Sequence, residues 1–194
     1  MNATEKRLYR INEIFRSVQG EGFWTGTAAV FVRMSGCNLS CPFCDTDHRA
    51  FTLMGAEDIA SAAKSLLPEG REGAPLLVLT GGEPALQADE ALVQALHGAG
   101  FRVHMETNGT LPVPDGIDWI TMSPKTGKVA LEKANELKLV LTPDADPERW
   151  SDFPADWRFL QPCSCRNTDE AVSYILAHPI WRLSLQTHKY LDIK

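Results

Sequence analysis

The chain has 194 residues, of which 44% are hydrophobic and 23% charged, a composition typical of a folded globular protein rather than a disordered one. Its formal charge of −6 argues against binding to the phosphate backbone of nucleic acids, and no apolar stretch approaches the ~20 residues of a membrane span. The length predicts a single domain, residues 1–194, and five cysteines with an N-terminus that lacks an apolar run predict a reducing, cytoplasmic location.

Short apolar runs alternate with helical patterns along the chain. In order, these patterns predict strands at 9–15 and 29–34, a helix at 56–67, a strand at 76–79, a helix at 86–98, strands at 101–105, 119–122, 137–141 and 158–160, a helix at 168–177 and a strand at 181–185. Strands that alternate with helices indicate an α/β fold with mostly parallel strands. Because the units are too few for a full eightfold barrel, we expect a partial (β/α) barrel.

Nearly every predicted strand is followed by a polar cluster that contains Gly or Pro. Loops favour these residue types in any case, so composition accounts for part of the pattern. It does not account for three thiols at one strand end and ionisable or hydrogen-bonding side chains at others. Since α/β folds bind ligands at the carboxyl edge of the sheet, we expect a site at that edge.

Three cysteines, Cys37, Cys41 and Cys44, lie directly after the predicted strand 29–34. Soft thiolates favour zinc or an iron–sulfur cluster over calcium or magnesium. A set of three leaves one metal position open, either one iron of a cuboidal cluster or the substrate position of a catalytic zinc. The incomplete ligand set therefore indicates a reactive centre.

A structural zinc site is the alternative interpretation. Cys41 and Cys44 could combine with Cys163 and Cys165, or with His48, to complete a tetrahedral set. That arrangement leaves Cys37 without a role.

Other side chains near these strand ends suit an anionic ligand. The hydroxyl of Thr46 offers an oxygen donor of the kind that magnesium accepts, although a turn residue is an equal alternative. Arg33 suits a carboxylate bound by two hydrogen bonds. His188 could be a second carboxylate contact, although a lone histidine is more often structural. Glu21 could accept hydrogen bonds from an amino-pyrimidinone edge.

The segment Gly81-Gly82-Glu83-Pro84 ends a predicted strand. Two glycines permit positive φ and close approach of a ligand to the main chain. The alternative is an ordinary turn between a strand and a helix.

The Cys-x3-Cys-x2-Cys spacing, with Phe43 before the last cysteine, resembles the signature of the radical S-adenosylmethionine superfamily. The resemblance implies a [4Fe–4S] cluster held by Cys37, Cys41 and Cys44, with S-adenosylmethionine on the uncovered iron. It also implies that the reduced cluster cleaves the sulfonium to give a 5′-deoxyadenosyl radical. The glycine segment at 81–84 resembles the loop that meets the amino group of S-adenosylmethionine in that superfamily.

Further segments are similar to the 7-carboxy-7-deazaguanine synthase family, and they span the chain from near Ile11 to near Lys194. They lie at 11–15, 18–22, 31–33, 37–46, 80–84, 106–109, 123–125, 161–162 and 185–189. The Gln-Gly-Glu-Gly and Gln-Thr-His-Lys segments make this resemblance far more specific than the cysteines do.

The resemblance implies a homodimeric lyase that converts 6-carboxy-5,6,7,8-tetrahydropterin to 7-carboxy-7-deazaguanine and ammonia, on the route to queuosine. It implies regenerated S-adenosylmethionine, Mg²⁺ at Thr46 and a reducing donor such as flavodoxin. The expected substrate contacts are Val18, Gln19, Gly20, Glu21, Arg33, Thr80 and His188. The expected S-adenosylmethionine contacts are Phe43, Asp45, Gly82, Ser123, Pro124, Lys125, Gln161, Pro162, Cys163 and Ser164. The resemblance gives no role to the thiols of Cys163 and Cys165.

Two other functions compete with this one. A glycyl-radical activating enzyme carries the same cysteine spacing and acts on a protein, whereas Arg33, Glu21 and His188 suit a small carboxylated heterocycle. A zinc-stabilised binding module without catalysis is the second alternative.

Overall fold

The computed structural model describes residues 7–44, 46–70 and 72–194. Its strands are β1 (Leu8–Val18), β2 (Ala28–Met34), β3 (Thr52–Gly55), β4 (Leu76–Gly81), β5 (Arg102–Thr107), β6 (Trp119–Met122), β7 (Ala134–Leu141), β8 (Ala155–Pro162) and β9 (Arg182–Leu183). Its α-helices are α1 (Ala56–Ser65), α2 (Glu90–Gly98), α3 (Thr168–Ala177) and α4 (Thr187–Leu191). Short 3₁₀ turns lie at Pro84–Leu86, Glu148–Trp150 and Cys163–Cys165.

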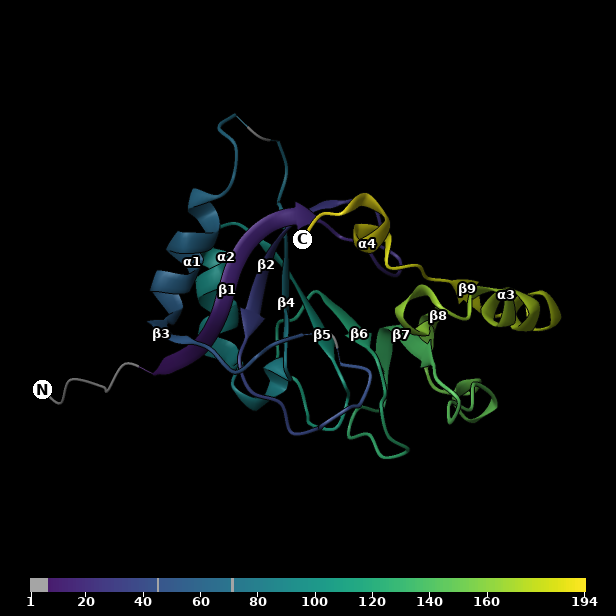
Figure 1. Ribbon diagram of the computed structural model, residues 1–194. Coiled ribbons are helices and arrows are strands. Elements are labelled where there is room, and N and C mark those ends of the chain that lie inside the picture. The colour runs from purple at the N-terminus through teal and green to yellow at the C-terminus, as the bar shows by residue number, and fades with distance from the viewer. Residues whose placement is uncertain (1–6, 45, 71) are drawn as a thin grey trace, which may run out of the picture.

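Within the described residues the strands form one nine-stranded sheet in the order β3-β1-β2-β4-β5-β6-β7-β8-β9 (Figure 1). Every neighbouring pair from β2 to β9 is parallel, whereas β1 pairs antiparallel with β2 and β3. The expected α/β partial barrel with mostly parallel strands is therefore confirmed. Parallel strands that follow one another along the chain are joined by crossovers of the same hand. Together with the twist of the strands, these crossovers curve the sheet, and its concave side is called the inner face below.

Several predicted boundaries differ from the structure, and two elements were not predicted. The helix predicted at 86–98 starts at Glu90, because the Asp89 carboxylate caps it by accepting a hydrogen bond from Leu92 N at 3.0 Å. The strand predicted at 181–185 shrinks to the edge pair Arg182–Leu183. The strand β3 and the helix α4 were not predicted, since each is too short to show a period.

The two faces of the strands have different environments, as the alternation of side chains requires. In β2, Val30, Val32 and Met34 are buried in the core that α1 and α2 cover, for example against Ile59. Phe31, on the other face, packs in a separate inner cluster. The inner face is therefore free to carry the polar residues of a site.

The outer helical layer is incomplete in the middle of the sheet (Figure 1). Helices α1 and α2 lie beside the first strands and α3 beside the last ones, while the described connections 108–118 and 123–133 contain no helix. In the part of the chain that the structure describes, no helix has the length and apolar character needed to cross a membrane.

The antiparallel β1 sends its loop to the opposite edge from the other loops. Val18 pairs with Ala28, and Ala29 pairs with Leu76, so the loop 19–27 lies at the amino ends of the parallel strands. In Figure 1 the end of β1 lies beside α4 and the C-terminus, while the loops that follow β2 and β5 lie at the other end. The inner cavity is thus approached from two sides.

Substitution of Gly81 by alanine tests the backbone contact between β4 and β2. Gly81 has a φ of +123°, and an added Cβ would lie 2.2 Å from the backbone oxygen of Met34. We expect Gly81→Ala to lower the free energy of unfolding by about 3 kcal/mol or more, in anaerobic urea denaturation. Gly26→Ala is the control, since Gly26 has a φ of +89° but nothing within 4 Å, and it should cost only about 1–2 kcal/mol. Equal losses of unfolding free energy in the two variants would show that the contact between β4 and β2 does not restrict Gly81.

Candidate active site

A cavity of about 610 Å³ lies on the inner face of the sheet, a size typical of small-molecule sites. Most of the predicted site residues line it: Val18, Gln19, Gly20, Glu21, Arg33, Cys37, Cys41, Phe43, Cys44, Thr46, Thr80, Gly82, Ser123, Lys125, Gln161, Pro162, Cys163, Ser164 and His188. Pro124 does not line it, and Asp45 lies outside the described residues. The structure therefore brings residues from the whole length of the chain to one place.

Three free thiols, Cys37, Cys41 and Cys44, form one wall of the cavity. The loop is ordered locally, since Leu39 N donates to Cys37 Sγ at 3.4 Å and Cys44 N donates to the Cys41 carbonyl at 3.1 Å. Burial raises the pKa of the Cys41 thiol, and the nearby Lys125 ammonium opposes that shift. The cavity side of this wall is open to a ligand.

The thiol wall fits a cluster better than a single zinc ion. Among residues 7–44, 46–70 and 72–194, no three His, Cys, Asp or Glu side chains gather around a position for one ion. A tetrahedral zinc requires such convergence, and Cys163, Cys165 and His48 do not provide it. A cuboidal cluster takes each thiolate on a different iron, so its three ligands stay apart.

The Gly81-Gly82-Glu83 segment fixes the position of the cysteine loop. Gly82 N donates to the Met34 carbonyl at 3.0 Å, and Glu83 N donates to the Gly36 carbonyl at 2.9 Å. A Cβ on Gly82 would lie 1.9 Å from Gly36 O, so the backbones can approach only at glycine. An ordinary turn does not account for this contact between two strand ends.

The carboxylate of Glu83 is structural. It is fully buried and accepts hydrogen bonds from Thr107 Oγ1 and Asn108 N, both at 2.7 Å. Burial raises the pKa of this carboxyl, and the two hydrogen bonds oppose that shift. Glu83 thereby joins the end of β4 to the loop after β5.

Arg33 and Thr46 form a polar corner of the cavity. The Nε atom of Arg33 lies 2.9 Å from Glu13 Oε1, and its Nη1 donates to Thr46 Oγ1 at 3.4 Å. The Arg33 guanidinium carbon also lies 5.7 Å from the centroid of the Phe15 ring. These contacts fix a cation beside a hydroxyl, an arrangement suited to a carboxylate ligand.

Each residue of the Gln-Gly-Glu-Gly segment has a tertiary contact that explains it. Gln19 Nε2 donates to Glu106 Oε1 at 3.1 Å, and Glu21 pairs with Lys138. A Cβ on Gly20 would lie 2.3 Å from His188 Nδ1. A Cβ on Gly22, which has a φ of +66°, would lie 1.9 Å from an oxygen of Glu136. The segment is thus more than a glycine turn.

The C-terminal segment packs on this loop. Thr187 donates to the Gly20 carbonyl through both its backbone N and its Oγ1, each at 2.9 Å. Gln186 Nε2 donates to Glu21 Oε1 at 3.0 Å. Loop 19–27 and α4 therefore close the cavity together, and His188 lines it from this side.

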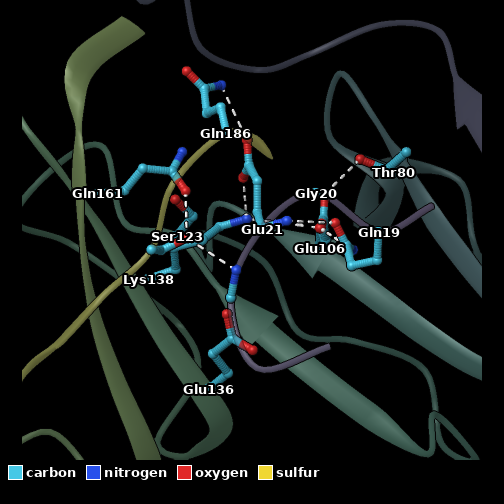
Figure 2. A network of polar contacts seen from close by, with 12 residues as sticks. Gln19, Gly20, Glu21, Thr80, Glu106, Ser123, Glu136, Lys138, Gln161 and Gln186 are labelled. Carbon is cyan, nitrogen blue, oxygen red and sulfur yellow. Dashed lines mark hydrogen bonds and ion pairs between the residues drawn. The ribbon is translucent and has the colours of Figure 1, made fainter. Parts of the chain in front are cut away.

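Lys138 and Glu106 are residues that sequence reasoning did not select. Both line the cavity, and Figure 2 shows them in one network with Gln19, Glu21 and Thr80. A lysine between leucines, in a strand expected to be buried, was the available signal for Lys138. Glu106 begins the polar segment 106–109, and its sequence context alone indicates no role for the carboxylate.

The charges of this network depend on one another. Burial alone would lower the pKa of the Lys138 ammonium, but Glu106, Glu21 and Glu136 outweigh burial and raise it. Burial would likewise raise the pKa of the Glu21 carboxyl, but the charge of Lys138 and hydrogen bonds from Lys138 and Gln186 lower it. Glu21 and Lys138 are therefore charged at neutral pH.

Lys125 stands between the network and the thiol wall. Its Nζ donates to Ser123 Oγ at 2.7 Å and lies 5.7 Å from the centroid of the Phe43 ring. Burial lowers the pKa of its ammonium, and the charge of Lys138 adds to that shift.

A thiol wall inside a partial parallel barrel is the arrangement of a radical S-adenosylmethionine enzyme, and the Radical SAM superfamily model matches residues 31–150. The chain is 52% identical over 188 residues to the 7-carboxy-7-deazaguanine synthase of Bacteroides thetaiotaomicron, which covers 96% of this chain and 100% of that relative. The chain therefore belongs to the 7-carboxy-7-deazaguanine synthase family of that superfamily, and this membership implies a [4Fe–4S] cluster and S-adenosylmethionine.

Other comparisons agree. The enzyme of the same name from Bordetella pertussis is 45% identical over 211 residues, which cover 95% of this chain and 99% of that relative. The crystal structure of QueE from Escherichia coli superposes with a TM-score of 0.76 at 29% identity, over 92% of this chain and 93% of that one. Membership of this family argues against both alternative functions, the zinc-stabilised binding module and the glycyl-radical activating enzyme.

Substitution of Gly20 by alanine tests the contact between the loop and the C-terminal segment. The new Cβ would displace His188, because 2.3 Å is too short for any contact with its ring. We expect the backbone amide of Thr187 to exchange with deuterium at least ~10-fold faster in Gly20→Ala. Gly98→Ala is the control, since nothing lies within 4 Å of that position. Unchanged exchange in Gly20→Ala would show that the segment does not depend on this contact.

Proposed function

We propose that this chain converts 6-carboxy-5,6,7,8-tetrahydropterin to 7-carboxy-7-deazaguanine and ammonia, a step toward queuosine and related deazapurines. The proposal draws on the names of relatives with 52% and 45% identity. The observation that carries it is the cavity itself, which combines a thiol wall with Arg33 at one polar corner and two carboxylates, Glu21 and Glu106, at another. This polarity is complementary to a ring that bears a carboxylate on one side and N–H donors on the other.

The side of the cavity next to the cysteines would hold the cofactors. Cys37, Cys41 and Cys44 would hold the cluster. When bound, the cluster and S-adenosylmethionine supply a carbon-centred radical that removes a hydrogen atom from the pterin. The residues assigned to S-adenosylmethionine are those that line the cavity here: Phe43, Gly82, Ser123, Lys125, Gln161, Pro162, Cys163 and Ser164. Pro124 lies between two of these residues and does not itself line the cavity.

Arg33, with Thr46 beside it, binds the substrate carboxylate, and His188 contacts the substrate from the side of Gly20 and Glu21. The guanidinium of Arg33, held by Glu13 at 2.9 Å, offers paired N–H groups to that carboxylate. Thr46 would offer one oxygen ligand to Mg²⁺, an ion that usually takes only one or two ligands from protein. This corner fixes the orientation of the ring, a positioning role that can supply several kcal/mol of the catalytic effect.

The ring edge faces Glu21 and Glu106, which line the same cavity. The carboxylates of Glu21 and Glu106 accept hydrogen bonds from its amino and ring N–H groups. Val18, Gln19, Gly20 and Thr80 also line the cavity, and α4 packs on loop 19–27 beside it.

We extend the proposal to the setting of the reaction. The chain acts as one domain over residues 1–194 and as a homodimer in the cytoplasm. It receives electrons from a reducing donor such as flavodoxin, and it requires Mg²⁺.

Anaerobic reconstitution with iron and sulfide tests the activity. The reconstituted protein, supplied with the carboxylated tetrahydropterin, S-adenosylmethionine, reductant and Mg²⁺, should form the deazapurine chromophore. S-adenosylmethionine should be regenerated, so many products should form for each one lost. Consumption of one S-adenosylmethionine per product would contradict regeneration, and no chromophore would contradict the function.

Paired cysteine variants test the thiol wall. Cys41→Ser should lose bound iron and all activity, because a serine hydroxyl is a poor ligand for iron. Cys165→Ser should keep both, since Cys165 does not line the cavity. Iron analysis and the visible absorption of the cluster give the measurement. Iron loss in both variants would place the cluster elsewhere.

Substitution of Arg33 tests the carboxylate corner. We expect Arg33→Gln to raise KM for the pterin by about 10–100-fold, because a charged pair of hydrogen bonds is worth about 1.5–3 kcal/mol. Arg33→Lys should have an intermediate effect, since lysine keeps the charge but not the paired geometry. The KM for S-adenosylmethionine, measured alongside, should stay constant. A fall in kcat alone would assign Arg33 a different role.

A further inference from the structure

Lys138 is a buried cation inside the cavity. Its neighbours Leu137 and Leu139 point into the outer core, so Lys138 itself lies on the inner face of β7. Its side chain is only 5% exposed. Because moving an ammonium group out of water costs several kcal/mol, a buried lysine requires charged partners. The partners of Lys138 therefore indicate the function of its ammonium group.

Two carboxylates from distant segments meet the Lys138 ammonium (Figure 2). Glu21 Oε2 forms a close ion pair with it, and Glu106 Oε1 lies 3.7 Å away. Glu21 comes from loop 19–27 at the amino edge of the sheet, whereas Glu106 lies on β5. Lys138 therefore brings together two acidic side chains that the fold supplies from opposite directions.

Neutral groups also donate hydrogen bonds to these carboxylates. Glu21 Oε1 accepts from Gln186 Nε2 at 3.0 Å. Glu106 accepts from Gln19 Nε2 at 3.1 Å and from Thr80 Oγ1 at 2.9 Å. A carboxylate has about four acceptor positions, so both retain capacity toward the cavity that they line.

The charge balance around Lys138 depends on its ammonium. The titratable groups that face it are Glu21 of loop 19–27, Glu106 of β5, Glu136 of β7 and Lys125 after β6, with His188 of α4 beside Glu21. Three carboxylates in a buried space repel one another unless a cation lies among them. Lys125 lies nearer the thiol wall, where its Nζ donates to Ser123. Lys138 is the cation at the centre of the three.

We propose that Lys138 is a positioning residue that selects the heterocycle, because its ammonium holds Glu21 and Glu106 together as hydrogen-bond acceptors for a ring edge with adjacent N–H groups. The inference rests on the proposed function, whose pterin carries an amino group beside a ring N–H. Ionised carboxylates only accept hydrogen bonds. A ring with a carbonyl in place of the amino group sets oxygen against oxygen, and the site rejects it.

The test compares Lys138→Met with Lys138→Arg in the reconstituted holoenzyme, with the exposed Lys64→Met as control. KM for the carboxylated tetrahydropterin is measured anaerobically between pH 6 and 9. In wild type and in Lys138→Arg we expect KM to change no more than ~3-fold over this pH range, because the cation keeps the Glu21 carboxyl ionised. In Lys138→Met a buried carboxyl binds a proton at low pH, so KM should be raised about 10–100-fold at pH 6.5 and should fall as pH rises.

Two measurements separate this role from a structural one. Bound iron, and formation of 5′-deoxyadenosine without pterin, should be unchanged in Lys138→Met, since the thiol wall does not include Lys138. The 2-oxo analogue of the substrate should bind wild-type holoenzyme at least ~10-fold more weakly than the 2-amino compound, a measurement that needs no variant. Lys138→Arg should keep this preference.

Specific outcomes overturn the inference. A KM in Lys138→Met that is raised equally at every pH would show a packing role, and an unchanged KM would show no role. Equal binding of the two rings by wild type would contradict selection by the carboxylates, even if Lys138→Met failed to fold. If the wild-type protein forms the deazapurine, each of these results overturns only the role of Lys138 and leaves the proposed function intact. A wild type without product contradicts the function itself.

Discussion

The structure depends on one contact between backbones, where the end of β4 lies against the end of β2. Hydrogen bonds from Gly82 N to the Met34 carbonyl and from Glu83 N to the Gly36 carbonyl join the two strand ends, at 3.0 and 2.9 Å. Any side chain on Gly82 would overlap the oxygen of Gly36. Because the cysteine loop starts at the next residue, this contact sets where the thiols face. Glu83 extends the same contact to β5 by its hydrogen bond with Thr107.

The cavity is assembled from two edges of the sheet with different kinds of contact. At the carboxyl edge, the loops that follow parallel strands supply the thiols and the residues assigned to S-adenosylmethionine, as α/β folds commonly do. At the amino edge, the antiparallel β1 brings loop 19–27 inward, where α4 covers it. The carboxylates of Glu21 and Glu106 meet between these edges at Lys138, which gives that part of the cavity its charge.

The sequence was sufficient for the fold class and for most of the residues that line the cavity. The alternation of short apolar runs with helical patterns predicts a parallel sheet, and the motif spacing marks the thiols. Periodicity could not reveal that β1 is antiparallel, because strand direction depends on pairing partners far away in the chain. Lys138 was missed for a related reason: a single lysine among leucines shows its role only through Glu21 and Glu106, which lie on other segments.

The two edges differ in how much change they can accept. At the cofactor edge the contacts are made by main chain against main chain, and positions such as Gly82 admit no other residue. At the ring edge Gly20 and Gly22 are restricted in the same way, but the charged contacts are made by side chains, Glu21 with Lys138 and Glu106 with Thr80. Such side chains can be exchanged in complementary pairs. A lineage could therefore alter which ring is recognised by paired substitutions on this scaffold while its radical chemistry stays constant.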